Sequence, residues 1–271
     1  MAGNIKIFTQ EIIEQFKKRE VTVIPEVLAF NFMMALIPML IVFFQILTFL
    51  SIETTMLDVI MTNYLPTIMH DFIMNFRNAD AAIRFNSNPI LIIVTLGTLL
   101  FTISKGINGI FKAFQITYSD TLEAHYKHRL KAIIVFLLLL IFAAMAVGVL
   151  TASHFMFTHI PNGVRNVIEM IILTFLCFAF FFLLFRLAPN KKKKAKQILP
   201  GVLFTTAGFI VTSLVFTFYV ERLANFNIYG ALAIIIILLT WLFLIGWVIN
   251  IGIQINYIIN KRFSENGFLR K

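Results

Sequence analysis

The sequence predicts an all-α integral membrane protein with six transmembrane helices, and three observations lead to this fold class. Hydrophobic residues make up 59% of the 271 residues and charged residues only 13%, whereas a soluble domain carries about 25% charged residues. The apolar residues gather in long runs that contain no charged side chain. Lysine and arginine gather in alternate stretches between those runs. A lipid bilayer is therefore the expected solvent for most of this chain.

The lengths of the runs set the expected spans, because a helix needs roughly 20 apolar residues to cross a hydrocarbon core about 30 Å thick. The fourth run, 170–185, is the shortest, and the long side chain of Arg186 extends it toward the headgroups. A loop around Tyr229 and Gly230 is expected to divide the last run. The spans form one domain over 1–271 and are placed at about 27–51, 86–104, 132–157, 168–186, 198–220 and 231–257.

The distribution of positive charge predicts the orientation of the chain. Of the 23 lysine and arginine residues, 19 lie in four alternate stretches, namely 1–26, 105–131, 186–196 and 261–271. Cytoplasmic loops carry the excess of these residues, so both termini are expected in the cytoplasm. The net charge of +10 is interpreted as this orientation and as contact with anionic lipid headgroups. Nucleic acid is not an expected partner, and the oligomeric state is left open.

Three stretches outside the spans are predicted to lie at the membrane surface. Residues 4–20 form an amphipathic anchoring helix with apolar side chains on one face, namely Ile5, Phe8, Ile12 and Phe16. In 53–84 apolar residues recur every three or four positions, which predicts an extracellular helix that packs on the bundle or gates it. The lysine-rich turn 190–196 is interpreted as a headgroup anchor, with a phosphoinositide-like or nucleic-acid site as the alternative.

The spans differ in what they offer to neighbouring helices. Pro38 removes a backbone hydrogen bond from the first span and favours a kink. The phenylalanine-rich fourth span is predicted to face lipid. Acidic residues are expected only at span ends, which argues against a carboxylate relay inside the membrane; they are Glu26, Glu169 and Glu221. Small residues in the third and fifth spans predict close-packing seams; they are Ala144, Gly148 and Ala152, and Gly201, Thr205, Gly208 and Thr212.

Polar side chains at helical spacing define the candidate site. In the first span Asn31, Pro38 and Gln45 are seven residues apart and share one face. In the sixth span one face carries four candidates at spacings of three, four and three, namely Trp247, Asn250, Gln254 and Tyr257. Asn108 lies near the inner end of the second span, and Lys105 and Lys112 are candidate headgroup contacts beside it.

Two interpretations of these side chains remain open. Amides inside a membrane often hydrogen-bond to neighbouring helices, each contributing about 0.6–2 kcal/mol. Alternatively, they line a cavity that opens to the cytoplasm or the inner leaflet and suits an amphipathic anion, such as a phosphorylated lipid headgroup. No catalytic residue, metal or cofactor is expected, because Cys177 is the single cysteine, His154 and His159 are five apart, and no phosphate-binding loop or Ser/His/Asp grouping occurs.

Short motifs in a characteristic order resemble the YihY/BrkB-like family of bacterial inner-membrane proteins, some of which were labelled ribonuclease BN. They are Leu28-Ala29-Phe30 with Pro38, Ile107-Asn108 with Phe111, Tyr219-Val220, Tyr229-Gly230, Trp241-Leu242 and Gly252 through Asn256. The resemblance covers most of the chain and implies a six-helix protein of the bacterial cytoplasmic membrane. The family often has a glutamate where this sequence has Gln254, so a proton carried by that acid is not available here.

Three functions follow from these observations. The first is a transporter or flippase-like protein for an amphipathic, anionic envelope component, which rests on the polar stripes, on Pro38 and on the association of the family with the envelope. The second is a non-transporting scaffold or accessory protein of envelope integrity. The third, a membrane-bound ribonuclease, has the least support, because acid/base or metal-binding groups do not cluster on the cytoplasmic side. The protein is therefore not expected to be an enzyme.

Overall fold

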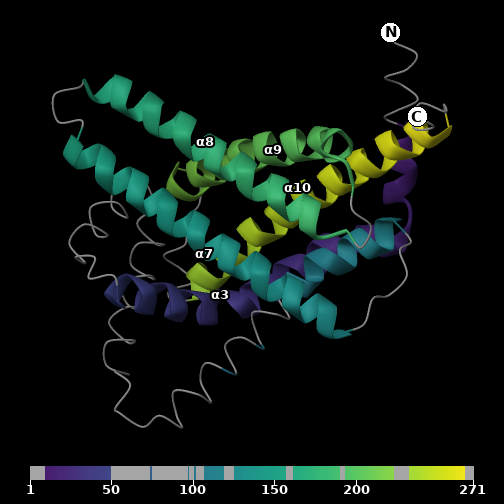
Figure 1. The fold of residues 1–271 in the computed structure, drawn as a ribbon, viewed down its shortest axis with the longest axis horizontal. Helices are drawn as coiled ribbons and strands as arrows, with labels where there is room; N and C mark the ends of the chain where they lie inside the picture. The colour runs from purple at the N-terminus through teal and green to yellow at the C-terminus, as the bar shows by residue number, and fades with distance from the viewer. Residues whose placement is uncertain are drawn as a thin grey trace.

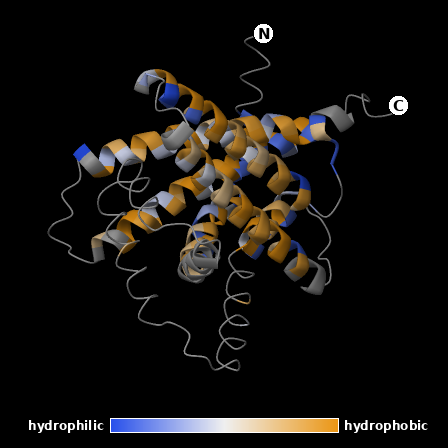
Figure 2. Ribbon diagram, turned by 60° about the vertical axis from the view of Figure 1, so that its left-hand side comes forward, coloured by the Kyte–Doolittle hydropathy of each residue, from blue (hydrophilic) through white to orange (hydrophobic). Residues whose placement is uncertain are grey.

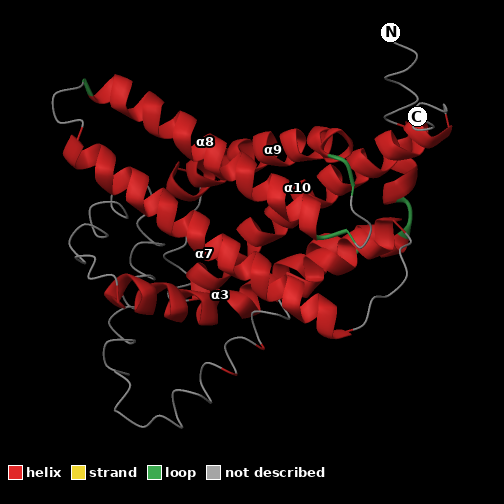
Figure 3. Ribbon diagram, viewed as in Figure 1, coloured by secondary structure: helices red, strands yellow, loops and turns green. Residues whose placement is uncertain are grey.

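The described part of the chain is built from α-helices joined by short turns (Figure 3). A computed structural model describes residues 10–49, 107–118, 125–156, 161–189, 193–222 and 232–265, together with the single positions 74, 97 and 101. The helices are α2 (Arg19–Thr22), α3 (Ile24–Phe49), α7 (His125–Met156), α8 (Asn162–Leu187), α9 (Ala195–Arg222) and α10 (Leu232–Glu265). Residues 10–16 and 107–118 are also helical. The predicted all-α class is confirmed.

Four of the described helices are long and apolar enough to cross a membrane. They contain the apolar segments Leu130–Ser153, Gly163–Leu187, Ala195–Val220 and Ile235–Lys261. Helix α3 contributes a shorter apolar segment, Ile24–Leu36. The expected second span, 86–104, and the expected extracellular helix, 53–84, lie outside the described residues except at positions 74, 97 and 101. The number of six spans therefore stays a prediction.

The outward faces of the helices are apolar, which is the physical reason to place them in a bilayer. Leu137 on α7, Phe175 on α8 and Val215 on α9 are all more than half exposed. Hydrophobic residues cover most of the length of the bundle helices, and hydrophilic residues lie mainly near the helix ends, as Figure 2 shows. Water would penalise such surfaces by roughly 25 cal/mol per Å², whereas lipid tails contact them without cost.

Helix α10 is the central element of the described bundle (Figure 1). It packs against α3 on one side and α9 on the other, while α8 packs against both α7 and α9. The largest core cluster joins side chains from all these helices and from the 107–118 helix. Its fully buried members include Leu28, Phe114, Phe185 and Ile253.

The prediction that the whole fourth span faces lipid is wrong for the second half of α8. Phe175 is 66% exposed, but Phe181 and Phe185 are buried. The ring of Phe185 meets Phe114 edge to face, with ring centroids 5.1 Å apart. Phenylalanine suits lipid and protein interiors equally, so composition alone did not distinguish the exposed half from the buried half.

The two predicted small-residue seams have different outcomes. On α9, a Cβ atom added at Gly201 or Gly208 would run into α10, so these glycines do allow a close approach. On α7, a Cβ atom added at Gly148 would find no atom of the described residues within 4 Å, and Ala152 is exposed among them. The seam on the third span therefore has no partner among the described residues at Gly148 and stays a prediction.

Two further expectations are corrected. The helix predicted over 4–20 is not continuous, because the described segment 10–16 ends at a turn over Lys17 and Lys18 before α2 begins. Glu169 does not mark a span end: it lies inside the apolar segment of α8 and is 3% exposed. Arg165, four residues earlier on the same helix, pairs with Glu169, and this pairing makes a buried carboxylate tolerable.

Candidate functional site

The candidate site lies along one face of α10, where it meets α2 and the 107–118 helix. Asn250 and Gln254 are four residues apart on this face and have no exposed surface. Nδ2 of Asn250 donates a hydrogen bond of 2.9 Å to the carbonyl oxygen of Val21. Nε2 of Gln254 donates one of 2.8 Å to Oγ1 of Thr117 and lies 3.5 Å from Oδ1 of Asn250. These amides therefore connect three helical elements far apart in the sequence.

Gln254 is only half satisfied. Its Oε1 atom is buried and has no hydrogen-bond partner in the described part of the chain. An unpaired buried acceptor costs about 1–3 kcal/mol, and such atoms commonly bind water or a ligand group. On the 107–118 helix, Oδ1 of Asn108 is also buried and has no hydrogen-bond partner among the described residues. Both atoms are acceptors, so the group that satisfies them must be a hydrogen-bond donor such as water.

Asn31 on α3 packs against the 107–118 helix, which carries Asn108. A Cβ atom added at Gly109 would lie 2.8 Å from Nδ2 of Asn31, so the glycine lets the amide of α3 approach the backbone of the 107–118 helix. Pro38 and Gln45 lie further along α3, and their side chains are outside the described residues, as is all of Lys105. The predicted face of the first span is therefore described only at Asn31.

A cationic and aromatic group lies one turn beyond Gln254. The rings of Tyr257 and Tyr118 meet edge to face at 5.6 Å, and Tyr118 stacks on Phe114 at 6.2 Å. Nζ of Lys193, in the turn before α9, lies 4.7 Å from the centre of the Tyr118 ring. This is the distance range of a cation–π interaction. The structure thus places Lys193, a member of the lysine-rich turn that the sequence predicts to be a headgroup anchor, on Tyr118, the ring partner of Tyr257.

The remaining candidates have separate surroundings. Trp247 packs against Phe16, with ring centroids 5.6 Å apart, and so fixes the helical segment 10–16 on α10. Lys112 is exposed on the 107–118 helix. Among the described residues, no group of three histidine, cysteine, aspartate or glutamate side chains could hold a metal ion.

Asn256 is a buried polar residue of α10 that the sequence did not single out as a site. Its Oδ1 accepts a hydrogen bond of 2.7 Å from the backbone N–H of Gly201, and its Nδ2 donates one of 3.0 Å to the carbonyl oxygen of Ile198. Pro200 lies between these two residues and has no N–H to donate. Asn256 therefore completes the backbone bonding of the first turns of α9. It lies off the polar stripe, so helical spacing did not reveal it.

A bundle with apolar outer faces and fully buried amides between its helices defines an α-helical membrane protein. Comparison with known sequences makes this class more specific. The profile of the Virulence factor BrkB family matches residues 12–269, and the chain belongs to this family. The resemblance drawn from the sequence motifs is thereby confirmed.

The relatives carry two kinds of name. The chain is 26% identical to the ribonuclease-like protein YfkH of Bacillus subtilis (strain 168), an alignment that covers 94% of this chain and 96% of YfkH. It is 24% identical to a UPF0761 membrane protein of Histophilus somni (strain 2336), over 96% and 92% of the two chains. A UPF0761 membrane protein of Pelodictyon phaeoclathratiforme is 25% identical, and the aligned part is about half of that longer protein. No solved structure matches the chain.

Proposed function

We propose that this protein is a transporter or flippase-like protein that moves an amphipathic, anionic envelope component across the bacterial cytoplasmic membrane. The observation that carries the proposal is the half-satisfied amide of Gln254, which is fully buried where α2, the 107–118 helix and α10 meet. A purely structural amide would be expected to use both its donor and its acceptor. This acceptor, unpaired among the described residues, supports a polar or hydrated route at the junction.

The charge around the same junction favours an anion. Lys193 sits on the Tyr118 ring, which in turn contacts Tyr257, three residues beyond Gln254. Lys194 and Lys196 are exposed nearby in the sequence. A headgroup phosphate would be attracted to these lysines, while its acyl chains would stay among the apolar side chains on the outside of the bundle. Such a substrate is amphipathic, which matches the two kinds of surface.

The topology belongs to the same proposal. Six spans with both termini in the cytoplasm would place the turn before α9 at the inner membrane surface, since this turn is the most lysine-rich stretch of the chain. A single cysteine introduced at Lys194, in a background with Cys177 replaced by serine, should be labelled by a membrane-impermeant maleimide only after cells are opened. Labelling in intact cells would contradict the orientation.

The first functional prediction concerns Gln254. Purified protein in liposomes should speed the flip of a fluorescent phosphatidylglycerol, and Gln254→Leu should lower the rate about tenfold, because about 1.4 kcal/mol of barrier corresponds to a factor of ten. The leucine has a similar volume and lacks both polar groups. Dithionite quenching of the outer-leaflet label measures the rate.

Thr240→Val on the same helix is the matched control, since Thr240 is exposed and its hydroxyl donates to the carbonyl of Ile236 within its own helix. The double variant Asn250→Ala with Gln254→Ala should also reach the membrane and lose flipping. Flipping by wild-type protein no faster than by empty liposomes would reject the proposal. Full activity in Gln254→Leu would reject the role of this amide.

The second prediction concerns charge selection by Lys193. Lys193→Gln should reduce the preference for phosphatidylglycerol over phosphatidylcholine about two- to fivefold, the factor that corresponds to a cation–π contact of about 0.5–1 kcal/mol. Lys193→Arg should keep the preference, because arginine retains both the charge and the ring contact. Lys194→Gln, at an exposed lysine, is the control. An equal loss in both glutamine variants would mean that the lysines act only through net charge.

A scaffold or accessory role in envelope integrity is the second candidate, and a specific observation favours it. The amide nitrogens of Asn250 and Asn256 both donate hydrogen bonds to backbone carbonyls of other helices. Residues that only hold helices together would do the same. In that case Gln254→Leu would lower the stability of the protein and leave an envelope phenotype in proportion to the amount of folded protein. One relative has the term ribonuclease-like in its name, and among the three relatives above this name is the one link to a ribonuclease activity. We propose that this chain is not an enzyme.

A further inference from the structure

Pro25 leaves the carbonyl group of Val21 without a donor from its own helix. A helical carbonyl accepts from the backbone N–H four residues later, and for Val21 that residue is Pro25, which has no N–H. Asn250 supplies the missing donor, since its Nδ2 lies 2.9 Å from the Val21 oxygen. Gly246 allows this approach, because a Cβ atom added there would lie 2.9 Å from the carbonyl oxygen of Pro25. The break between α2 and α3 therefore decides which end of the Asn250 amide faces it.

The orientation of Asn250 in turn fixes the orientation of Gln254. A backbone carbonyl only accepts hydrogen bonds, so Nδ2 of Asn250 faces Val21 and Oδ1 is left to face Gln254. Oδ1 lies 3.5 Å from Nε2 of Gln254, and the reverse placement of that amide would bring two oxygen atoms together. The other hydrogen on Nε2 is donated to Oγ1 of Thr117, at 2.8 Å. Both donors of Gln254 are thus used within the protein, and its Oε1 remains as an acceptor.

This remaining acceptor selects the kind of group that can bind beside it. Oε1 of Gln254 is buried and has no hydrogen-bond partner within the described structure. The oxygen atoms of a phosphodiester are acceptors themselves, so they cannot satisfy it. A hydroxyl group can, because it has a proton to donate. A ligand that reaches Gln254 must therefore bring a donor in addition to its phosphate.

The neighbouring cation sets a second condition. Lys193 lies over the ring of Tyr118, the residue that follows Thr117 in the sequence. Tyr118 also contacts Tyr257, which is about 4.5 Å beyond Gln254 along the axis of α10. A cation at this junction attracts phosphate and repels an ammonium group. The donor that suits the junction is therefore an uncharged hydroxyl.

We propose that the junction selects an anionic phosphodiester headgroup that carries a hydroxyl group, and that Oε1 of Gln254 accepts the hydrogen bond from this hydroxyl. The phosphate binds on the side of Lys193. This inference rests on the proposed function and makes its substrate narrower, because negative charge alone does not suffice. A lipid of the same charge without a hydroxyl group leaves Gln254 unpaired and is a poor substrate.

Two lipids of equal charge test the inference in the wild-type protein. Phosphatidylglycerol and phosphatidylpropanol have the same phosphodiester and the same number of headgroup carbons, and only the first has headgroup hydroxyls. With one fluorescent acyl chain on both, phosphatidylglycerol should flip about tenfold faster in phosphatidylcholine liposomes, a ratio that corresponds to about 1.4 kcal/mol. Dithionite quenching measures both rates. The comparison needs no variant, so it stays decisive if a substitution prevents folding.

Two variants separate the hydroxyl from the charge. Gln254→Leu removes the acceptor, so the two lipids should flip at equal rates. Lys193→Gln should slow both lipids by the same factor and keep the ratio between them. Thr240→Val is the control and should keep both rates, because the exposed Thr240 donates to a carbonyl of its own helix.

The outcomes distinguish this inference from the proposed function. If wild-type protein flips both lipids at one rate that exceeds the rate in empty liposomes, the inference is overturned and the transport proposal stands. A preference for phosphatidylglycerol that persists in Gln254→Leu would overturn the role of Oε1. If neither lipid moves faster than in empty liposomes, both proposals are overturned.

Discussion

Gly201→Ala should destabilise the helical bundle by about 3 kcal/mol, the upper end of the usual cost of overpacking a core. The added Cβ atom would collide with the backbone carbonyl of Gly252 and would lie 2.5 Å from Cγ and Nδ2 of Asn256. Neither neighbour is the free end of a flexible side chain, so α9 and α10 must move apart. Detergent-driven unfolding in mixed micelles, followed by circular dichroism, measures the loss.

Gly148→Ala is the matched control for this prediction. It adds the same methyl group to a helix, and no atom of the described residues lies within 4 Å of the new Cβ. Because alanine also favours helix over glycine by about 1 kcal/mol, this variant should be as stable as the wild type or more stable. An equal destabilisation by both substitutions would show that the contact between α9 and α10 is not as close as the structure has it.

A second substitution should restore part of the stability that Gly252→Ala removes. The stability that Gly201→Ala removes should not be restored in this way. At Gly252 the nearest atom to an added Cβ is Oγ1 of Thr205, a fully buried hydroxyl without a hydrogen-bond partner among the described residues. Thr205→Ala removes this oxygen and leaves the backbone in place. The double variant should therefore be more stable than Gly252→Ala alone in the same unfolding measurement.

Asn256→Leu should cost about 2 kcal/mol, although leucine is the residue that suits a membrane best. The substitution leaves the N–H of Gly201 without its acceptor and removes the amide donor from the carbonyl of Ile198. An unsatisfied buried backbone group costs about 1–3 kcal/mol, and Asn256 has no exposed surface at which bulk water could replace the lost bonds. The same unfolding assay measures the effect.

Thr240→Val is the comparison for Asn256→Leu, because it also removes a polar group from α10. Thr240 is exposed and bonds within its own helix, so its replacement should change stability by no more than about 0.5 kcal/mol. If Asn256→Leu were as stable as the wild type, the amide would not be needed to hold the beginning of α9 against α10.

Hydropathy and charge were sufficient to predict the class of the molecule. An apolar run of twenty residues has one stable conformation in lipid, since a helix satisfies all of its backbone hydrogen bonds internally. The runs after residue 130 accordingly coincide with long helices, from Leu130–Ser153 to Ile235–Lys261. That Asn250 and Gln254 share one face could also be predicted from the sequence, because residues four apart lie on the same face of any helix.

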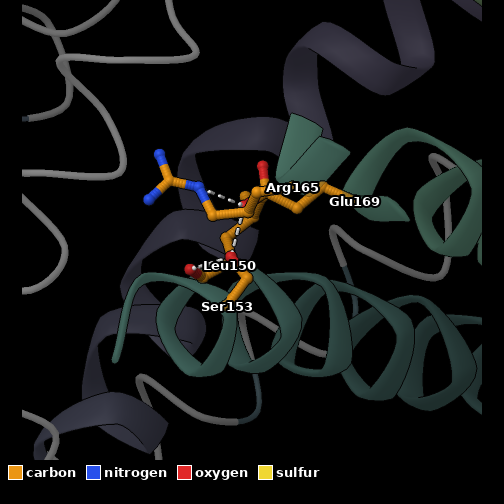
Figure 4. A network of polar contacts seen from close by, with 4 residues as sticks. All are labelled: Leu150, Ser153, Arg165 and Glu169. Carbon is orange, nitrogen blue, oxygen red and sulfur yellow. Dashed lines mark hydrogen bonds and ion pairs between the residues drawn. The ribbon is translucent and has the colours of Figure 1, made fainter. Parts of the chain in front are cut away.

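The hydrogen-bond partners of the polar residues on α10 could not be predicted from the sequence. Nothing in the local pattern joins Asn250 to Val21 or Asn256 to Gly201, since these contacts link positions 229 and 55 residues apart. The place of Glu169 was missed for the same reason. A carboxyl group is typical of the end of a span, and the contacts of Glu169 with Arg165 and with Ser153 on a different helix explain how it is accommodated inside one (Figure 4).

By itself, the sequence determined that this chain forms apolar helices suited to a bilayer, because that outcome depends on each segment and its solvent alone. Only the tertiary structure decided which faces of those helices meet lipid, which amides are saturated and which buried oxygen atoms are left unpaired. Lipid tails and protein interiors are equally apolar, so composition does not distinguish them, and the choice rests on shape and hydrogen bonds between distant helices.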